Sequence, residues 1–404
     1  MKLTARRIVF SVVAFGTLGM LTIGSCTDSP SRVAGVAPPE SPVFARGGTT
    51  GVQRVTVSPA TSTRDIGQTV QLTATAVDKK GNVVSGVTFA WSSNAPAIAT
   101  VSSAGLVTAV AAGTATISAT GNGKTGNASV TVNAPPPPPG AVTLIAAGDI
   151  AQCGSSNDEA TALLVDNIPG TVAPLGDVVY ESGSASEFTN CYEPSWGRFK
   201  SRTKPSVGNH EYQTLNATGY YNYFGAAAGD PTKGYYSYDL GNWHIIVLNS
   251  NCSIVSCAAG SAQEQWLRND LIANTKQCTL AYFHHPRFNS GASHGNNTAV
   301  GAFWTALYQY GAELILNGHE HMYERFAPQT PDAVSDPVNG IRQFTVGTGG
   351  RAFYSIGTVK PNSQVRNNNT YGVIRLTLGA GTYSWQFVPV AGSTFTDSGT
   401  ESCH

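Results

Sequence analysis

The stretch ELILNGHEH, residues 313–321, joins an apolar run directly to two histidines and a glutamate. Such a run, followed by Gly, is typical of a buried strand that ends in a functional loop. Around it, short apolar runs alternate with amphipathic stretches: strands are expected at residues 143–147, 244–248, 280–283 and 313–316, and helices at 157–168, 261–271 and 299–310. Residues 344–346, 373–378 and 383–388 add further strands. We therefore predict an α/β core with added antiparallel strands.

Polar side chains follow several of these apolar runs. In chain order the clusters are Gly148-Asp149, Gly176-Asp177-Val178-Val179-Tyr180, Gly208-Asn209-His210-Glu211, His284-His285 and Gly318-His319-Glu320-His321. Functional groups concentrate in such loops because a rigid sheet positions them. Carboxylate, amide, phenol and imidazole together form a ligand set that suits Fe, Mn or Zn. There are enough ligands for two ions, with one carboxylate able to bridge them.

The order and spacing of the five clusters resemble the metallophosphoesterase (calcineurin-like) superfamily, and more closely the purple acid phosphatases. The resemblance runs from about Leu144 to Val388. The first cluster, Asp149-Ile150-Ala151, lacks the His that most superfamily members carry, whereas Tyr180 stands where purple acid phosphatases place a tyrosinate ligand. The runs QEQWL (263–267) and MYER (322–325) also resemble that family. The resemblance implies two mixed β-sheets flanked by helices.

The resemblance also implies a ligand set. The first metal would be bound by Asp149, Tyr180 and His321, the second by Asn209, His284 and His319, with Asp177 bridging. Phenolate and carboxylates favour Fe(III) in the first site because hard anionic oxygens stabilise high charge. Zn, Mn or Fe(II) fits the second site.

The family's chemistry is hydrolysis of a phosphate ester, in which two metals hold the ester and activate a hydroxide for in-line attack. His210 and His294 would stabilise phosphate charge or protonate the leaving group. The other histidines receive structural interpretations. His285 is expected to support the ligands from outside, His244 to be a hydrogen-bonded packing residue, and the C-terminal His404 to have no catalytic role.

Residues 51–133 show strand alternation without helical periodicity, with Val70, Leu72, Ala74 and Ala76 on one side. This segment resembles the bacterial Ig-like domains of group 2, which implies an all-β sandwich that serves as a spacer or adhesion module. Five prolines at 135–139 predict a stiff linker over residues 134–141, so the catalytic domain is expected at 142–404.

The first residues predict export. Lys2, Arg6 and Arg7 precede an apolar run, the order of a signal peptide over residues 1–26, with a short membrane anchor as the alternative. The end of the run resembles a lipoprotein signal, so Cys26 is a candidate lipid anchor. Residues 27–50 read as a flexible tether. We expect an extracellular, periplasmic or membrane-anchored protein.

Composition narrows the class of partner. Lys plus Arg and Asp plus Glu both number 24, and charged residues make up 12% of the chain. A protein that binds nucleic acid through phosphate contacts is normally basic, so this class is disfavoured. The substrate is expected to be a small phosphate ester, and the Ig-like segment could contact a cell surface or polysaccharide.

The cysteines fit an oxidising compartment. Setting Cys26 aside leaves six, which suggests up to three disulfides among 15 possible connectivities. Chain position favours the pairs Cys153–Cys191, Cys252–Cys257 and Cys278–Cys403.

The leading function is hydrolysis of phosphate monoesters by an exported enzyme. Two rivals stay open at this point. One is phosphodiesterase or nucleotidase activity at the same site, because no motif decodes loops such as residues 289–298. The other is a surface-binding protein with a catalytically inactive phosphatase-like domain.

Overall fold

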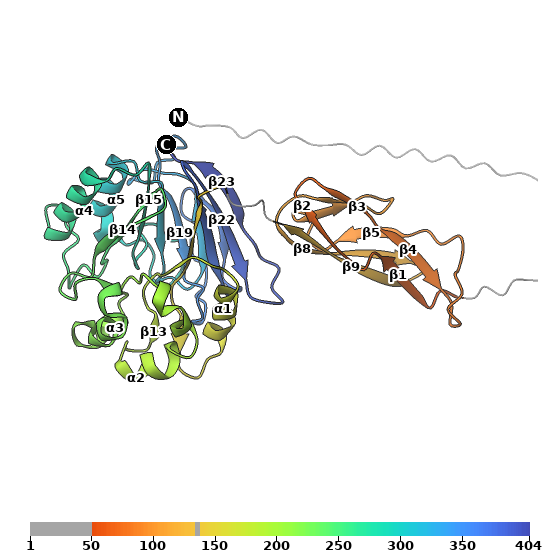
Figure 1. Cartoon of the computed structure of the whole chain (residues 1–404), viewed down its shortest axis with the longest axis horizontal. Helices are drawn as coiled ribbons and strands as arrows, with labels where there is room; N and C mark the ends of the chain where they lie inside the picture. The colour runs from red at the N-terminus through yellow and green to blue at the C-terminus, as the bar shows by residue number, and fades with distance from the viewer. Residues whose placement is uncertain (1–50, 134–137) are drawn as a thin grey trace, which may run out of the picture.

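The computed structural model describes residues 51–133 and 138–404, which form an all-β domain followed by a larger α/β domain (Figure 1). The predicted signal peptide, the tether with Cys26, and residues 134–137 of the linker lie outside the described residues. Among the helices of the described ranges, none has the length and apolar character of a membrane span.

The first domain is a β-sandwich, as predicted. Strand pairing gives the orders β2-β9-β8-β5, β3-β7-β6 and β1-β4. The strands are β1 (Arg54–Ser58), β2 (Thr61–Asp65), β3 (Thr69–Gln71), β4 (Thr73–Val77), β5 (Ala90–Ser93), β6 (Ala99–Val101), β7 (Leu106–Ala109), β8 (Gly113–Gly121) and β9 (Lys124–Asn133). Along β8 and β9 alternate side chains are buried, which places Ala115, Ile117, Val130 and Val132 in the core. The alternation read from the sequence therefore marks the buried face.

The second domain contains two large mixed sheets. The five-stranded sheet has the order β12-β10-β21-β22-β23, and the seven-stranded sheet β14-β15-β16-β17-β19-β18-β20. Their strands are β10 (Val142–Ala147), β12 (Thr171–Pro174), β21 (Gly372–Leu378), β22 (Thr382–Pro389), β23 (Ser398–Ser402), β14 (Tyr236–Leu240), β15 (Trp243–Val247), β16 (Cys278–Tyr282), β17 (Leu314–Asn317), β18 (Tyr323–Phe326), β19 (Arg342–Val346) and β20 (Ser363–Asn367). A short parallel pair, β11 (Ala151–Gln152) and β13 (Val179–Tyr180), lies beside them.

One apolar core joins the two sheets. Leu144, Leu280 and Leu316 belong to it and are fully buried, as are Trp243 and Phe387. A second core lies between the seven-stranded sheet and the helices α4 (Ala262–Ala273) and α5 (Gly301–Gln309), which cover its outer side in Figure 1. The fold class predicted from the sequence is confirmed, because parallel strand pairs and antiparallel additions occur in the same sheets.

The remaining helices are α1 (Asn157–Asp166), α2 (Ala185–Glu187) and α3 (Thr218–Phe224). The helices predicted at residues 157–168, 261–271 and 299–310 correspond to α1, α4 and α5. The α4 helix begins after Ser261-Ala262-Gln263-Glu264, which has the sequence of a capping box, but only half of this box is formed. Ser261 accepts from the backbone N–H of Glu264, whereas the Glu264 carboxylate bonds to Gly260 instead of Ser261. Residues 188–217 form mostly π- and 3₁₀-helical turns, which have no strong sequence period to announce them.

The three disulfides predicted from chain position are present. Cys153–Cys191 joins the residue after β11 to the π-helical turn Phe188–Tyr192, Cys252–Cys257 closes a short loop after β15, and Cys278–Cys403 ties the C-terminus to β16. Each cross-link constrains an irregular segment, so each contributes roughly 2–4 kcal/mol to stability.

His244 is a structural residue, as expected. Its ring lies between two carboxylates: Nδ1 is 3.0 Å from Asp239 and Nε2 is 2.8 Å from Asp270. Burial opposes the charged ring, but these two carboxylates outweigh burial and raise the pKa of His244 above its ordinary value. The protonated ring therefore ties β14 and β15 to α4.

This bridge predicts a pH-dependent contribution to stability. Because the pKa of His244 is raised in the folded state, its contribution is complete below about pH 6.5 and is lost as the pH rises through the raised value. His244→Gln should lower the free energy of unfolding by roughly 1–3 kcal/mol at pH 5 and by clearly less at pH 8.5. Urea unfolding at both pH values measures this. Equal destabilisation at both would show that the ring acts only through packing.

Candidate metal centre

The polar clusters meet at one edge of the two sheets, where most of them follow the carboxyl end of a strand. The cluster of Asn209 and His210 is the exception, because it lies in the irregular segment after the isolated bridge at Ser206. Asp149 follows β10 and Asp177 follows β12, two parallel neighbours. His284 follows β16 and His319 follows β17, which are parallel neighbours in the other sheet. The shared core holds the two edges together, so clusters that are 170 residues apart in the chain come into contact, as in the 2.9 Å hydrogen bond from His319 N–H to Asp149.

Asp149, Tyr180 and His321 form a first group. The Tyr180 hydroxyl lies 2.9 Å from Asp149 Oδ1 and 3.2 Å from His321 Nε2. The Nδ1–H of His321 donates to the carbonyl of Ala352 at 2.7 Å, so Nε2 is the ring nitrogen directed at the group. All three side chains are buried.

Asn209, His284 and His319 form a second group. His284 Nε2 lies 3.0 Å from Asn209 Oδ1 and 3.2 Å from His319 Nδ1. The Nδ1–H of His284 donates to the carbonyl of Leu175 at 2.8 Å, which again leaves Nε2 for the group.

Asp177 lies between the two groups. Its Oδ2 is 3.3 Å from the Tyr180 hydroxyl of the first group and 3.2 Å from His284 Nε2 of the second. The structure therefore brings all seven predicted ligand side chains together, in the arrangement of two groups that share one carboxylate.

The backbone at the ligands is strained. Asp149, Asp177 and His319 have φ values of +59°, +47° and +71°, a region that residues other than Gly rarely adopt. Such strain persists where surrounding structure enforces it, most often at functional sites. The neighbouring glycines permit close packing: a Cβ on Gly208 would lie 2.1 Å from Asp177 Oδ1.

Glu211 supports the bridging residue from behind. Its buried carboxylate accepts hydrogen bonds from the backbone N–H groups of Asp177 (3.0 Å), Val178 (2.8 Å) and Gly208 (2.7 Å). Burial and the nearby Asp177 raise the pKa of Glu211 to about 8. In the sequence Glu211 belongs to the third polar cluster, and no local pattern indicates this supporting role.

The buried carboxylates of the cluster favour positive charge beside them, as the pKa values of their neighbours indicate. Burial raises the pKa of Tyr180 well above its ordinary value, and the charges of Asp149 and Asp177 raise it further. Burial opposes the charged form of His284, but Asp177 outweighs burial and raises the pKa of His284 to about 9. A phenolate at Tyr180 would thus need a bound cation, and the mixed oxygen and nitrogen donors suit a transition metal.

The two predicted catalytic histidines lie on opposite flanks of the cluster. The His210 ring is 4.5 Å from the Tyr180 ring, and its Nε2 is 3.9 Å from Asp177. The His294 ring stacks on the His319 ring at 4.0 Å and is partly exposed. Both therefore border the seven-residue cluster without forming part of it.

His285 also lies beside the cluster. Strand alternation would point it away from His284, but β16 ends at Tyr282, so alternation no longer applies. The His285 ring lies 4.3 Å from the His319 ring, and its Nδ1 is 2.8 Å from the Ser250 hydroxyl. Burial and the neighbouring His284 lower the pKa of His285 to about 3, so the ring is neutral beside the cluster.

Sequence reasoning missed two residues at the site. The Arg351 guanidinium lies 4.7 Å from the Tyr180 ring centroid and forms an ion pair with Glu181 at 2.8 Å. The Tyr354 ring stacks on His321 at 3.9 Å. The only signal for them was the glycine-rich run that precedes them, GTGG at 347–350.

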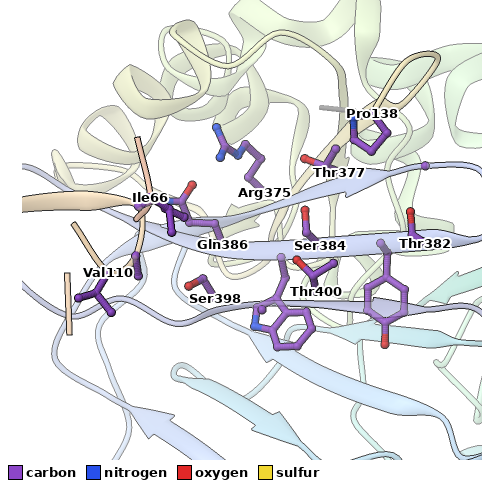
Figure 2. Close-up of a pocket in the computed structure, with 16 residues that line it drawn as sticks. Ile66, Val110, Pro138, Arg375, Thr377, Thr382, Ser384, Gln386, Ser398 and Thr400 are labelled. Carbon is purple, nitrogen blue, oxygen red and sulfur yellow. The ribbon is translucent and has the colours of Figure 1, made fainter. Parts of the chain in front are cut away.

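Two other features lie away from the cluster. Cys278, Glu313 and Cys403 gather in space, but the cysteines form a disulfide, so they offer no thiolate. A cavity of about 380 Å³ is lined by residues of β21–β23 and of the Ig-like domain, and Figure 2 shows Gln386 beside Ile66, with Thr377, Ser384 and Thr400 farther along the strands. None of its lining residues belongs to the cluster.

Comparison with known families agrees with this architecture. Residues 51–132 match the family model of the bacterial Ig-like domain (group 2), and residues 129–323 match that of the calcineurin-like phosphoesterases. The second domain is a calcineurin-like phosphoesterase domain. The predicted order of an Ig-like domain followed by this phosphoesterase domain is confirmed.

Individual relatives refine the comparison. The chain is 27% identical over 230 residues to purple acid phosphatase 15 of Arabidopsis thaliana, covering 48% of this chain and 42% of that protein. The chain thus spans less than half the length of this curated relative. Among solved structures, purple acid phosphatase PPD1 from yellow lupin (Lupinus luteus) seeds has a TM-score of 0.54 at 13% identity, covering 86% of this chain and 69% of that one.

A further solved structure shares the fold but has a different description. GAP50, the anchor in the inner membrane complex of Plasmodium, has a TM-score of 0.50 at 13% identity, covering 64% of this chain and 88% of that one. At this identity the likeness concerns the fold alone.

The hydrogen bonds that Glu211 accepts beside Asp177 predict that loss of its carboxylate destabilises the protein. Glu211→Ala removes the acceptor of three buried N–H groups and should lower the free energy of unfolding by roughly 2–4 kcal/mol. Thermal and urea unfolding measure the loss, with the exposed Glu193→Ala as control. Equal stability of the two variants would contradict a supporting role for Glu211.

Proposed function

We propose that this protein is an exported, dinuclear-metal phosphatase that hydrolyses phosphate monoesters. The observation that carries the proposal is the convergence of seven donor side chains from separate segments of the chain into two groups that share Asp177. The phosphoesterase family and the purple acid phosphatase relatives support the class of reaction. The three disulfides support export, because disulfides persist in oxidising compartments.

The donor chemistry fits two metals. Asp149, Tyr180 and His321 would hold the first and Asn209, His284 and His319 the second, with Asp177 shared. Hard anionic oxygens in the first group favour Fe(III), whereas an amide and two imidazoles in the second suit Zn, Mn or Fe(II). Hydrogen bonds from His284 and His321 to backbone carbonyls already direct Nε2 of each ring inward.

Bound metals would supply positive charge to hold the ester and activate water for in-line attack at phosphorus. The chain's own residues complete the site. His210 lies beside Asp177 with Nδ1 hydrogen-bonded to the carbonyl of Glu181, which leaves Nε2 to stabilise phosphate charge. His294, on the other flank, is placed to donate a proton to the leaving oxygen.

Two other functions compete with this proposal. A phosphodiesterase or nucleotidase could use the same donors with a different fit of the leaving group. An inactive surface-binding protein is the other alternative, because a phosphatase-like fold does not by itself establish activity. The retention of all seven donors favours catalysis. Contact with a polysaccharide or cell surface through the Ig-like domain, and a lipid anchor at Cys26, complete the proposed setting.

The tyrosinate assignment predicts colour. If Tyr180 binds Fe(III) as phenolate, the oxidised protein purified with iron available should absorb visible light and look pink to violet. Tyr180→Phe should abolish the band because no other phenol takes part, while metal analysis still finds bound iron. An iron-containing, fully active, colourless wild-type protein would exclude the tyrosinate. A colourless protein with only Zn or Mn would exclude the iron assignment.

The substrate class predicts a preference between two esters. The wild-type protein should hydrolyse p-nitrophenyl phosphate with a kcat/KM at least about tenfold higher than that for bis-p-nitrophenyl phosphate. Asp177→Asn should reduce activity on both by roughly a thousandfold or more, because the shared carboxylate is lost. A strong preference for the diester would replace the monoesterase proposal with the first alternative. Fewer than one bound metal per chain, together with no activity, would favour the binding protein.

A further inference from the structure

Glu320 lies between the two histidines of the segment 319–321 and has its own set of contacts. Its carboxylate is fully buried and is directed into the loop of residues 289–294. Oε1 accepts from Ser293 N–H at 3.2 Å. Oε2 accepts from Asn289 Nδ2 at 2.7 Å and from His294 N–H at 3.2 Å. One carboxylate thus gathers three donors from a single loop.

A fourth contact reaches the His294 ring. His294 Nδ1 lies 3.1 Å from Glu320 Oε2. An ionised carboxylate only accepts hydrogen bonds, so Nδ1 carries a proton in this contact and Nε2 is the ring nitrogen left for a substrate. The ring is also fixed from the sides, by stacking on His319 at 4.0 Å and by the edge contact with Tyr354 at 5.4 Å.

The loop is shaped to receive this carboxylate. A Cβ on Gly291 would lie 2.0 Å from Glu320 Oε1, so the backbone approaches as closely as Gly alone allows. The loop has another buried carboxylate contact at its start, where Ser290 N–H donates to Glu324 Oε2 at 2.9 Å. Glu324 accepts from Ser290 N–H and, among the described hydrogen bonds, makes none to His294. The two glutamates therefore bind different parts of the loop.

We propose that Glu320 is a positioning residue that sets the place and orientation of His294 and couples the loop 289–294 to the segment that bears His319 and His321. The catalytic consequence rests on the proposed function, in which His294 donates a proton to the leaving oxygen. As the P–O bond breaks, the Nε2 proton of the imidazolium passes to that oxygen, and the neutral ring keeps its Nδ1–H on Glu320.

The structural half of this proposal is tested without catalysis. Amide-resolved hydrogen exchange of the full chain, with and without added Zn²⁺, compares wild type, Glu320→Gln and Glu324→Gln. Glu320→Gln is nearly isosteric but turns an NH₂ group toward donors, so exchange at Ser293 and His294 should accelerate about tenfold or more. Glu324→Gln should accelerate exchange at Ser290 and leave His294 near the wild-type rate. Unchanged rates at His294 in Glu320→Gln, or equal acceleration in both variants, would overturn the proposal.

The catalytic half is tested by the leaving group. General acid catalysis matters most for poor leaving groups, so kcat of Glu320→Gln should fall about 10²-fold on glycerol 2-phosphate but less than about threefold on p-nitrophenyl phosphate. KM and metal content should stay near those of wild type. In a His294→Ala background, Glu320→Gln should change the ratio of the two kcat values by less than about twofold, because the residue it positions is gone.

Two results would contradict this catalytic role. Equal loss on both esters together with lost metal would show that Glu320 serves only the ligand segment. A full additional effect in the His294→Ala background would show that Glu320 acts independently of that histidine. If wild type hydrolyses neither ester, the proposed function fails, and the exchange experiment decides the positioning role by itself.

Discussion

Buried negative charge is the constraint around which the second domain is organised. Asp149 and Asp177 are almost fully buried, and the Tyr180 hydroxyl lies within hydrogen-bonding distance of both. At an effective dielectric constant of about 20, two unit charges 4 Å apart repel by roughly 4 kcal/mol. The protonated form of His284 offsets part of this repulsion, and bound cations would offset the rest. The same charges, which repel one another in the cluster, would therefore favour binding of a cation.

The two-sheet core is what allows this concentration of charge. Strand ends from both sheets meet at one edge. The fully buried apolar residues behind them pack the two sheets together and so hold these strand ends close to one another. Local strain at Asp149, Asp177 and His319 is held by that packing and by backbone hydrogen bonds such as those to Glu211. This packing holds the candidate ligands rigidly, whereas the loops beyond them are irregular. The loops carry His210 and His294, whose positions depend on carbonyl and carboxylate partners in other segments.

The Ig-like domain is organised by the alternation of buried and exposed side chains along its strands. Its core follows from strand alternation, as at Ile117 and Val130, and it contributes no residue to the seven-residue cluster. The cavity beside β21–β23 has mainly polar side chains from the phosphoesterase domain. The two domains therefore rely on different physical sources of structure: regular alternation in one, and convergence of distant strand ends in the other.

By itself the sequence determined the strands that carry the site and favoured the three disulfide pairs, whereas the seven candidate ligands followed from the resemblance of its polar clusters to purple acid phosphatases. Apolar runs that end in Gly-Asp or Gly-His are local patterns, and position along the chain restricts which cysteines can meet. Only the tertiary structure decided the orientation of His285, the half-formed cap at Ser261, and the roles of Glu211, Glu320, Arg351 and Tyr354. Their contacts join residues from separate segments, and a carboxylate that accepts backbone N–H groups leaves no periodic trace. The physical reason is that the type of a residue determines whether its side chain can bind a metal. The contacts that hold this side chain in place depend instead on which segments of the chain the fold brings together.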